Sequence, residues 1–126
     1  MKLSTLMVIN TFVAGLFGIA FVLVPGTLLS LYGVTLSQGG LVVARLFGAA
    51  LVGFGLLTFL AMKAEESEAR RAIIFALFLG DVVGFIVALQ GQLSGAINAL
   101  GWSTVVIYLL LALGFGYFQF VKASTS

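Results

Sequence analysis

The sequence predicts an all-α protein, a four-helix transmembrane bundle, and two observations support this fold class. Hydrophobic residues make up 62% of the 126 residues and charged residues only 8%, whereas soluble domains carry about 25% charged residues. A soluble core of this size could not bury so much apolar surface. The hydrophobic residues also gather in four separate runs, each long enough to cross about 30 Å of hydrocarbon as a helix. We therefore expect a single membrane domain over residues 1–126.

The four runs are hydrophobic all round, without a stripe at helical spacing, which is typical of helices embedded in lipid. The first run follows Lys2, as in a secretory signal peptide. It is too long for the apolar part of such a peptide, however, and Val24-Pro25-Gly26 is not a small-x-small cleavage site, so we interpret it as a retained helix. The four predicted spans are Leu6–Val24, Leu41–Met62, Ala72–Gln90 and Ser103–Val121.

The segment between the first two spans is not expected to be irregular throughout. Residues 27–32 predict a short interfacial helix, capped by Thr27 and ended by Gly33. The connection between the third and fourth spans is unusually apolar for a solvated loop. We expect that connection to lie at the membrane interface.

Basic residues predict the orientation of the four spans. Lys2, the three basic residues of segment 63–71, and Lys122 all fall on one side of a four-span topology. The two connections on the other side, residues 25–40 and 91–102, carry no charge. Because loops rich in Lys and Arg stay in the cytoplasm, we expect both termini to be cytoplasmic.

Composition excludes several classes of function. The chain has no Cys and no His, so haem, zinc, copper and iron–sulfur sites lack their usual ligands. A Ser-His-Asp or Cys-His nucleophile is excluded for the same reason. A net charge of +2 is too small for a nucleic-acid surface. We therefore expect no enzyme activity, no metal, no cofactor and no nucleic-acid partner.

Asp81 and Arg45 are the ionisable residues set inside the apolar runs. An Asp at the centre of a span costs about 2.5–3.5 kcal/mol on insertion, so an acid there indicates a functional site or a partner. Helical rise places the two residues about 7 Å apart along the membrane normal, within reach of a long Arg side chain. We expect an ion pair that clamps two helices together.

Two other interpretations of these residues stay open. The pair could form a proton- or ligand-coupled site. Alternatively, Arg45 reaches outward to the interface while Asp81 stays protonated and bonds Asn10 or a Ser or Thr hydroxyl. Asn10 is thus the expected polar support for the intramembrane site.

Small residues mark the expected helix contacts, because lipid tails compete with Leu for any other apolar surface. In the second span they follow the four-residue ladder of Arg45, and Ala44 and Gly48 lie beside it. In the third span they include a GxxxG pattern. Such a ladder indicates either packing inside one bundle or a dimerisation face. The expected packing residues are Ala49, Gly53, Ala76, Gly80, Gly84 and Ala88.

Short motifs give the chain a resemblance to a known group. They are Pro25-Gly26 and Tyr32-Gly33 after the first span, then Arg45-Leu46-Phe47-Gly48 and Gly53-x-Gly55 in the second. In these and in its layout the chain resembles the DoxX-like group of small bacterial four-helix membrane proteins. The resemblance implies a bacterial inner-membrane protein. Because some members of the group are accessory subunits of membrane redox complexes, it also implies contact with lipid or quinone. It transfers no catalytic residue.

These observations predict a non-catalytic accessory or structural subunit of a membrane complex. Its partners would be membrane lipid and either other membrane subunits or a second copy of the chain. The alternative is a small transporter or a hydrophobic-ligand-binding protein that uses Arg45 and Asp81.

Overall fold

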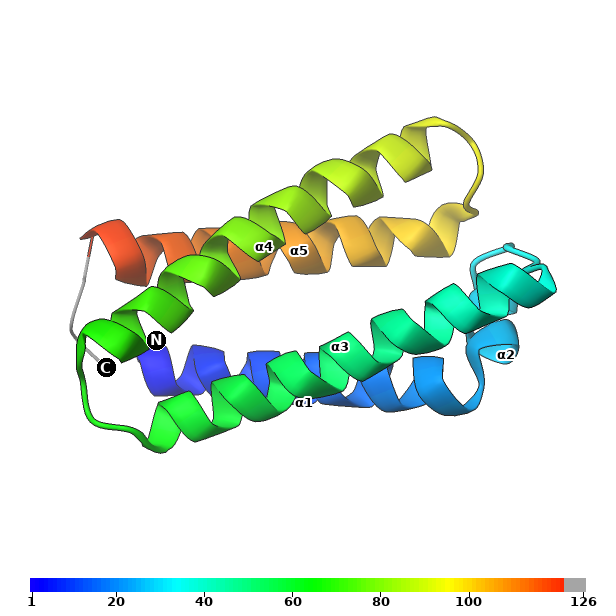
Figure 1. The fold of residues 1–126 in the computed structure, drawn as a ribbon. Coiled ribbons are helices and arrows are strands. Elements are labelled where there is room, and N and C mark those ends of the chain that lie inside the picture. The colour runs from blue at the N-terminus through cyan, green and yellow to red at the C-terminus, as the bar shows by residue number, and fades with distance from the viewer. Residues whose placement is uncertain (122–126) are drawn as a thin grey trace.

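The computed structural model describes residues 1–121, which form five α-helices and no strand (Figure 1). Four helices are long and apolar enough to cross a membrane, which confirms the all-α prediction and the number of candidate spans. Lys122, one of the expected topology signals, lies outside the described residues. Three of these spans are α1 (Leu3–Leu23), α3 (Gln38–Lys63) and α4 (Glu68–Leu93). The fourth span, Ala99–Val121, consists of a 3₁₀ turn (η1, Ala99–Gly101), α5 (Trp102–Gly116) and a π-helical segment (η2, Tyr117–Val121).

Polar caps extend two of the helices beyond their apolar runs. The Oγ atom of Ser37 accepts a hydrogen bond from the backbone N–H of Gly40 (3.1 Å) and starts α3. The Oγ atom of Ser67 accepts one from the N–H of Arg70 (3.1 Å) and starts α4. Because such caps satisfy N–H groups that have no partner within the helix, the helices begin three to four residues before the predicted spans.

The predicted interfacial helix is present as α2 (Pro25–Leu31). It starts two residues earlier than predicted, because Pro25 occupies the first helical position, where its fixed φ and missing N–H are tolerated. Thr27 is therefore inside the helix, and the prediction that it is the cap is wrong. Gly33 ends the segment as expected, with a left-handed φ of 77°.

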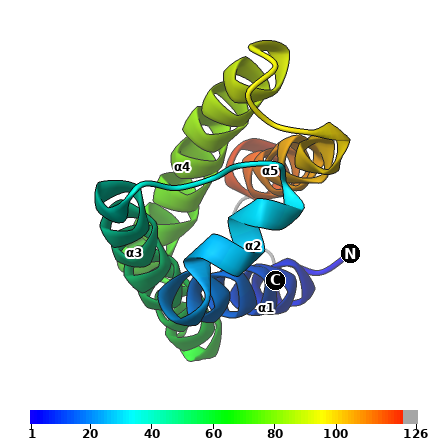
Figure 2. The ribbon, with the colours of Figure 1, turned by 90° about the vertical axis from the view of Figure 1, so that its right-hand side faces the viewer.

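The four long helices are arranged as two pairs (Figure 1). Helix α1 packs along α3, and α4 packs along α5. A short turn joins α3 to α4, yet these two helices make few contacts with each other. We call the end of the molecule that holds this turn and the N-terminus the core end. At the opposite end, α2 crosses between α1 and α5 (Figure 2).

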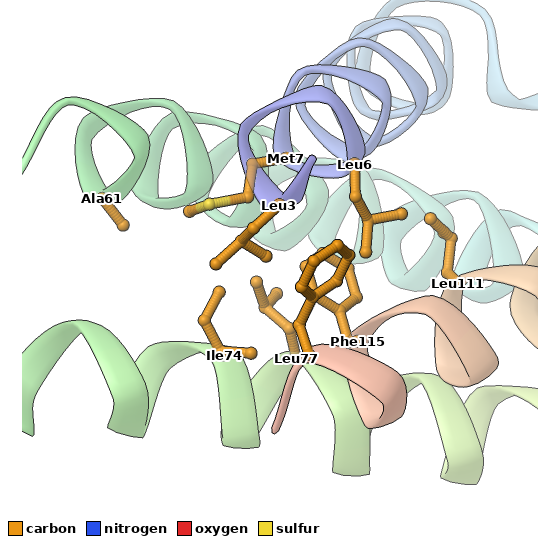
Figure 3. Packing of buried hydrophobic residues seen from close by; sticks show 9 residues of the cluster. Leu3, Leu6, Met7, Ala61, Ile74, Leu77, Leu111 and Phe115 are labelled. Atoms are coloured by element: carbon orange, nitrogen blue, oxygen red, sulfur yellow. The ribbon is translucent and has the colours of Figure 1, made fainter. Parts of the chain in front are cut away.

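The hydrophobic core lies at the core end and joins the two pairs. Side chains from all four long helices point into one space there (Figure 3). Met7 and Phe115 have no exposed surface at all. The buried cluster comprises Leu3, Leu6, Met7, Ala61, Ile74, Leu77, Leu111, Phe115 and Phe118.

Asn98 connects the two pairs at the end that holds α2. Its backbone N–H donates to the carbonyl of Tyr32 (2.9 Å), and its side-chain Nδ2 donates to the carbonyl of Leu31 (2.9 Å). The Nε2 atom of Gln92, in the last turn of α4, donates to the carbonyl of Asn98 (2.9 Å). The pairs are thus held together by apolar packing at one end and by hydrogen bonds at the other.

Candidate functional site

The expected ion pair between Arg45 and Asp81 is not formed. Within residues 1–121 the structure has one ion pair, between Arg71 Nη1 and Glu66 Oε1 at 3.5 Å. Arg45 is exposed on α3, and its Nε donates to the carbonyl of Val22 in α1 (3.3 Å). The pair fails because α3 packs on α1 rather than on α4. The clamp between α3 and α4 that the sequence suggested is therefore absent.

Asp81 is buried in α4 without a counter-charge. Its side chain is 9% exposed, and its Oδ2 atom has no hydrogen-bond partner among the described residues. Tyr108 belongs to α5, the helix that packs along α4. One turn further along α4, ring carbons of Tyr108 occupy the space where a side chain at Gly84 would begin. Asp81 thus faces α5, in a position where its carboxylate could accept a proton or bind a cation.

Asn10 supports a different helix contact from the one expected. Its Nδ2 donates to Thr58 Oγ1 in α3 (2.9 Å), and that hydroxyl donates to the carbonyl of Phe54 (2.7 Å). Both side chains are buried, and Thr58 has no exposed surface. Asn10 therefore fastens α1 to α3. Sequence reasoning missed Thr58, although its position on the same face as Gly48 and Gly55 could have identified it.

The small residues that α3 uses for packing lie one position away from the expected ladder. A Cβ atom at Gly48 would lie 2.7 Å from the carbonyl oxygen of Gly18, so the backbones of α1 and α3 are in direct contact there. The expected residues Ala49 and Gly53 are exposed instead. Apart from its two chain neighbours and the backbone of α3 itself, no part of residues 1–121 lies within 4 Å of a Cβ built on Gly53. The expectation that Ala49 and Gly53 pack inside the bundle is wrong.

The expected packing ladder of α4 divides into two halves. Gly84 and Ala88 are partly buried, and Gly84 lies against the ring of Tyr108. Ala76 and Gly80 are exposed, and no described atom lies within 4 Å of a Cβ built on Gly80. The GxxxG pattern therefore contributes only its second glycine to packing within the chain.

Arg70 is a buried charge that the sequence suggested only as a topology signal. Its side chain is 8% exposed. Its guanidinium makes one polar contact within residues 1–121, from Nη2 to the sulfur of Met7 at 3.9 Å, and its Nε has no partner there. It borders a small cavity of about 20 Å³ at the core end. The sequence does not indicate that Arg70 is buried, because its neighbour Arg71 carries the same charge and is exposed.

The described part of the chain has no group of three or more His, Cys, Asp or Glu side chains that could hold a metal ion. Comparisons with protein-family models, curated proteins and solved structures found no match to this chain. The candidate site thus consists of the two ionisable side chains of the apolar spans that lack an ion partner among residues 1–121, Arg45 at the surface of α3 and Asp81 inside the α4–α5 pair, together with the exposed small residues of α3 and α4.

Proposed function

We propose that this chain is a multi-pass protein of the bacterial inner membrane and a non-catalytic subunit of a larger membrane complex. It would pack against a transmembrane helix of a different protein. The observation that carries the proposal is the exposed ladder of α3, formed by Arg45, Ala49 and Gly53. We call this ladder the docking face.

Residue type makes the docking face suited to a helix rather than to lipid. A glycine offers lipid tails no side chain to pack against, whereas a second helix can approach closely only where side chains are small. No other helix among residues 1–121 fills the space beside Gly53. Within these residues the docking face makes one side-chain hydrogen bond, from Arg45 Nε to the carbonyl of Val22. Arg45 lies on the same ladder and is exposed without a carboxylate partner among residues 1–121. A partner helix that carries an acid would neutralise it.

The charge of Arg45 also favours a different protein over a second copy. Asp81 is the acidic residue inside the apolar spans of this chain, and it is buried against α5. A second copy therefore offers no acid on its surface at membrane depth. The resemblance to the DoxX-like group supports a redox complex as the setting, with contact to lipid or quinone.

The proposed orientation places the core end in the cytoplasm. Lys2, Lys63, Arg70 and Arg71 all lie at the ends of helices that meet there (Figure 1). The connections at the opposite end carry no charged residue. This asymmetry supports cytoplasmic termini by the positive-inside rule.

Purification from native membranes in a mild detergent tests the proposal, with identification of the membrane proteins that co-migrate. We expect a stoichiometric partner with an acidic residue in a span, and we expect Gly53→Leu and Arg45→Gln each to release it. Phe54→Leu is the matched control, because Phe54 is half-exposed on a different side of α3 and should leave the complex intact.

Three results would contradict the proposed assembly. The first is a wild-type chain that purifies alone, and the second is one that purifies only as a homo-oligomer. The third is a complex that survives both substitutions on the docking face, which would mean that Arg45 only reaches up to the interface.

A second candidate function rests on Asp81. A buried carboxylate oxygen without a partner, beside Tyr108, would suit a small transporter of protons or cations, or a protein that binds a hydrophobic amine. Flux measured in proteoliposomes tests this candidate. Asp81→Asn should abolish a proton- or cation-linked flux without loss of folding, whereas a wild-type protein with no flux above empty vesicles would exclude transport.

A further inference from the structure

Arg70 is buried at the core end without an anionic partner among residues 1–121. Its charge is removed from water, with 8% of the side chain exposed, and burial of an unpaired charge is costly. Its one polar contact within residues 1–121 is the sulfur of Met7, a weak acceptor. The Nε atom has no acceptor in the described part of the chain. The guanidinium thus has donor capacity that residues 1–121 do not use.

Neighbouring acids do not satisfy Arg70. Glu66, which shares the lining of the cavity, pairs with Arg71 at 3.5 Å. Glu65 and Glu68 are exposed, and neither forms an ion pair in residues 1–121. Since Arg71 neutralises Glu66, the positive charge of Arg70 is the surplus charge of this cavity.

The start of α4 adds to the attraction for an anion. Arg70 lies in the first turn of this helix, after the cap Ser67. A helix N-terminus carries roughly half a positive charge and is a common site for phosphate groups. The dipole of α4 therefore adds to the positive charge of Arg70 at this end of the helix, where Glu68 is the acidic residue of the first turn.

The length of α4 indicates that Arg70 lies near the phosphate layer of a bilayer. Helix α4 has 26 residues and is thus about 39 Å long, longer than the hydrocarbon core of about 30 Å. Its first turn therefore extends into the headgroup region. There, basic side chains meet the phosphates of lipids.

The cavity has two kinds of wall. Its polar groups come from Arg70, Gln119 and the ion-paired Glu66 and Arg71, and its apolar side comes from Leu3, Ile74 and Phe118. Its volume of about 20 Å³ is enough for one water-sized group, such as a single phosphate oxygen, and not for a whole headgroup.

We propose that this cavity binds the phosphodiester group of a membrane phospholipid. One non-bridging oxygen enters beside the Arg70 guanidinium, while the rest of the headgroup stays in the interface and the acyl chains stay outside the cavity. This site is separate from the docking face on α3 and does not depend on the proposed partner.

Native mass spectrometry of the detergent-solubilised full chain tests the site. Dioleoyl-phosphatidylglycerol is compared with dioleoylglycerol, which has the same acyl chains and no phosphate. We expect one phosphatidylglycerol to be retained and dioleoylglycerol to be lost. A large excess of inorganic phosphate should not displace the lipid. Equal retention of the two lipids would overturn the proposal, and displacement by inorganic phosphate would show a free-anion site instead.

Variants locate the lipid at Arg70. Arg70→Gln should lower retention by about tenfold or more, the effect of losing a charge-assisted contact. Lys63→Gln removes the same charge at the same end outside the cavity and should change retention less than about twofold. Equal losses in both variants would mean non-specific charge attraction. If Arg70→Gln fails to fold, Arg70→Lys takes its place, and retention as strong as in the wild type would overturn the role of the guanidinium.

Discussion

The α1–α3 contact and the α4–α5 contact both depend on glycine, but the glycines meet different neighbours. A Cβ at Gly48 would collide with backbone atoms of α1, at 2.7 Å from the carbonyl oxygen of Gly18. A Cβ at Gly84 would collide with the ring of Tyr108. A ring can rotate or be shortened by mutation, whereas a helix backbone cannot. The first pair should therefore tolerate no added atom, and the second should be adjustable.

The two pairs also differ in how they treat their buried polar groups. In α1–α3, Asn10 and Thr58 satisfy each other and the carbonyl of Phe54. In α4–α5, the buried Oδ2 atom of Asp81 accepts no hydrogen bond from residues 1–121. We therefore expect the Asn10–Thr58 hydrogen bond to stabilise the fold, and we expect no stabilisation from the Asp81 carboxyl group. Stability measurements in detergent can separate these roles, in four experiments with decreasing expected effects.

The largest effect is expected from Gly48→Leu. The added side chain must push α1 away from α3, and overpacking of this kind costs about 3 kcal/mol or more. Unfolding by titration with a denaturing detergent measures it. Gly53→Leu is the control on the same helix, because no other helix among residues 1–121 comes within 4 Å of its Cβ position, and it should change stability by less than about 0.5 kcal/mol. Equal losses would refute the backbone contact.

Gly84→Ala should have an intermediate effect. The new methyl group displaces the ring of Tyr108, at a cost of about 1–2 kcal/mol. Because the obstacle is a side chain, Tyr108→Leu in the same molecule should restore much of the loss in a double-mutant cycle. Additive losses would mean that α4–α5 is as rigid as α1–α3, and the distinction between the two pairs would fail.

Thr58→Val should lower stability by about 1 kcal/mol, the scale of a hydrogen bond between membrane helices. The change keeps the shape and leaves Asn10 Nδ2 without its acceptor. Thr11→Val is the matched control, since its hydroxyl bonds only the Met7 carbonyl in its own helix among the described residues. Equal effects of the two substitutions would show that the bond between α1 and α3 contributes nothing of its own.

Asp81→Leu should have the smallest effect. Removal of a buried carboxylate that lacks a counter-charge deletes a desolvation penalty, so we expect no loss beyond about 0.5 kcal/mol. Thermal unfolding in detergent measures it. A loss as large as that of Thr58→Val would mean that Asp81 has a stabilising partner, and the contrast between the two polar groups would disappear.

The sequence predicted the number and class of the helices because hydrophobic length alone decides whether a segment crosses a membrane. It predicted their centres better than their ends. Ser37 and Ser67 start α3 and α4 outside the apolar runs, and cap residues can be read only once the helix that they start is known.

The packing faces could not be predicted to the same degree. Helix α3 has small residues on two adjacent ladders, one with Ala44 and Gly48 and one with Ala49 and Gly53. A shift of one residue turns a helix face by about 100°, and nothing in a single sequence distinguishes the two ladders. The direction in which Arg45 points depends on which ladder packs inside the bundle. Because the Ala44–Gly48 ladder packs and the Ala49–Gly53 ladder is exposed, the predicted ion pair between Arg45 and Asp81 was wrong as well.

The tight α1–α3 contact has a consequence for how the chain is made. All of its residues lie between Leu3 and Lys63, so the whole hairpin is synthesised, and emerges from the ribosome, before α4. Membrane helices insert first and associate afterwards, and N-terminal units form first during synthesis. The first two long helices can therefore leave the insertion machinery as a finished unit, and α4 and α5 then assemble on it as on a template.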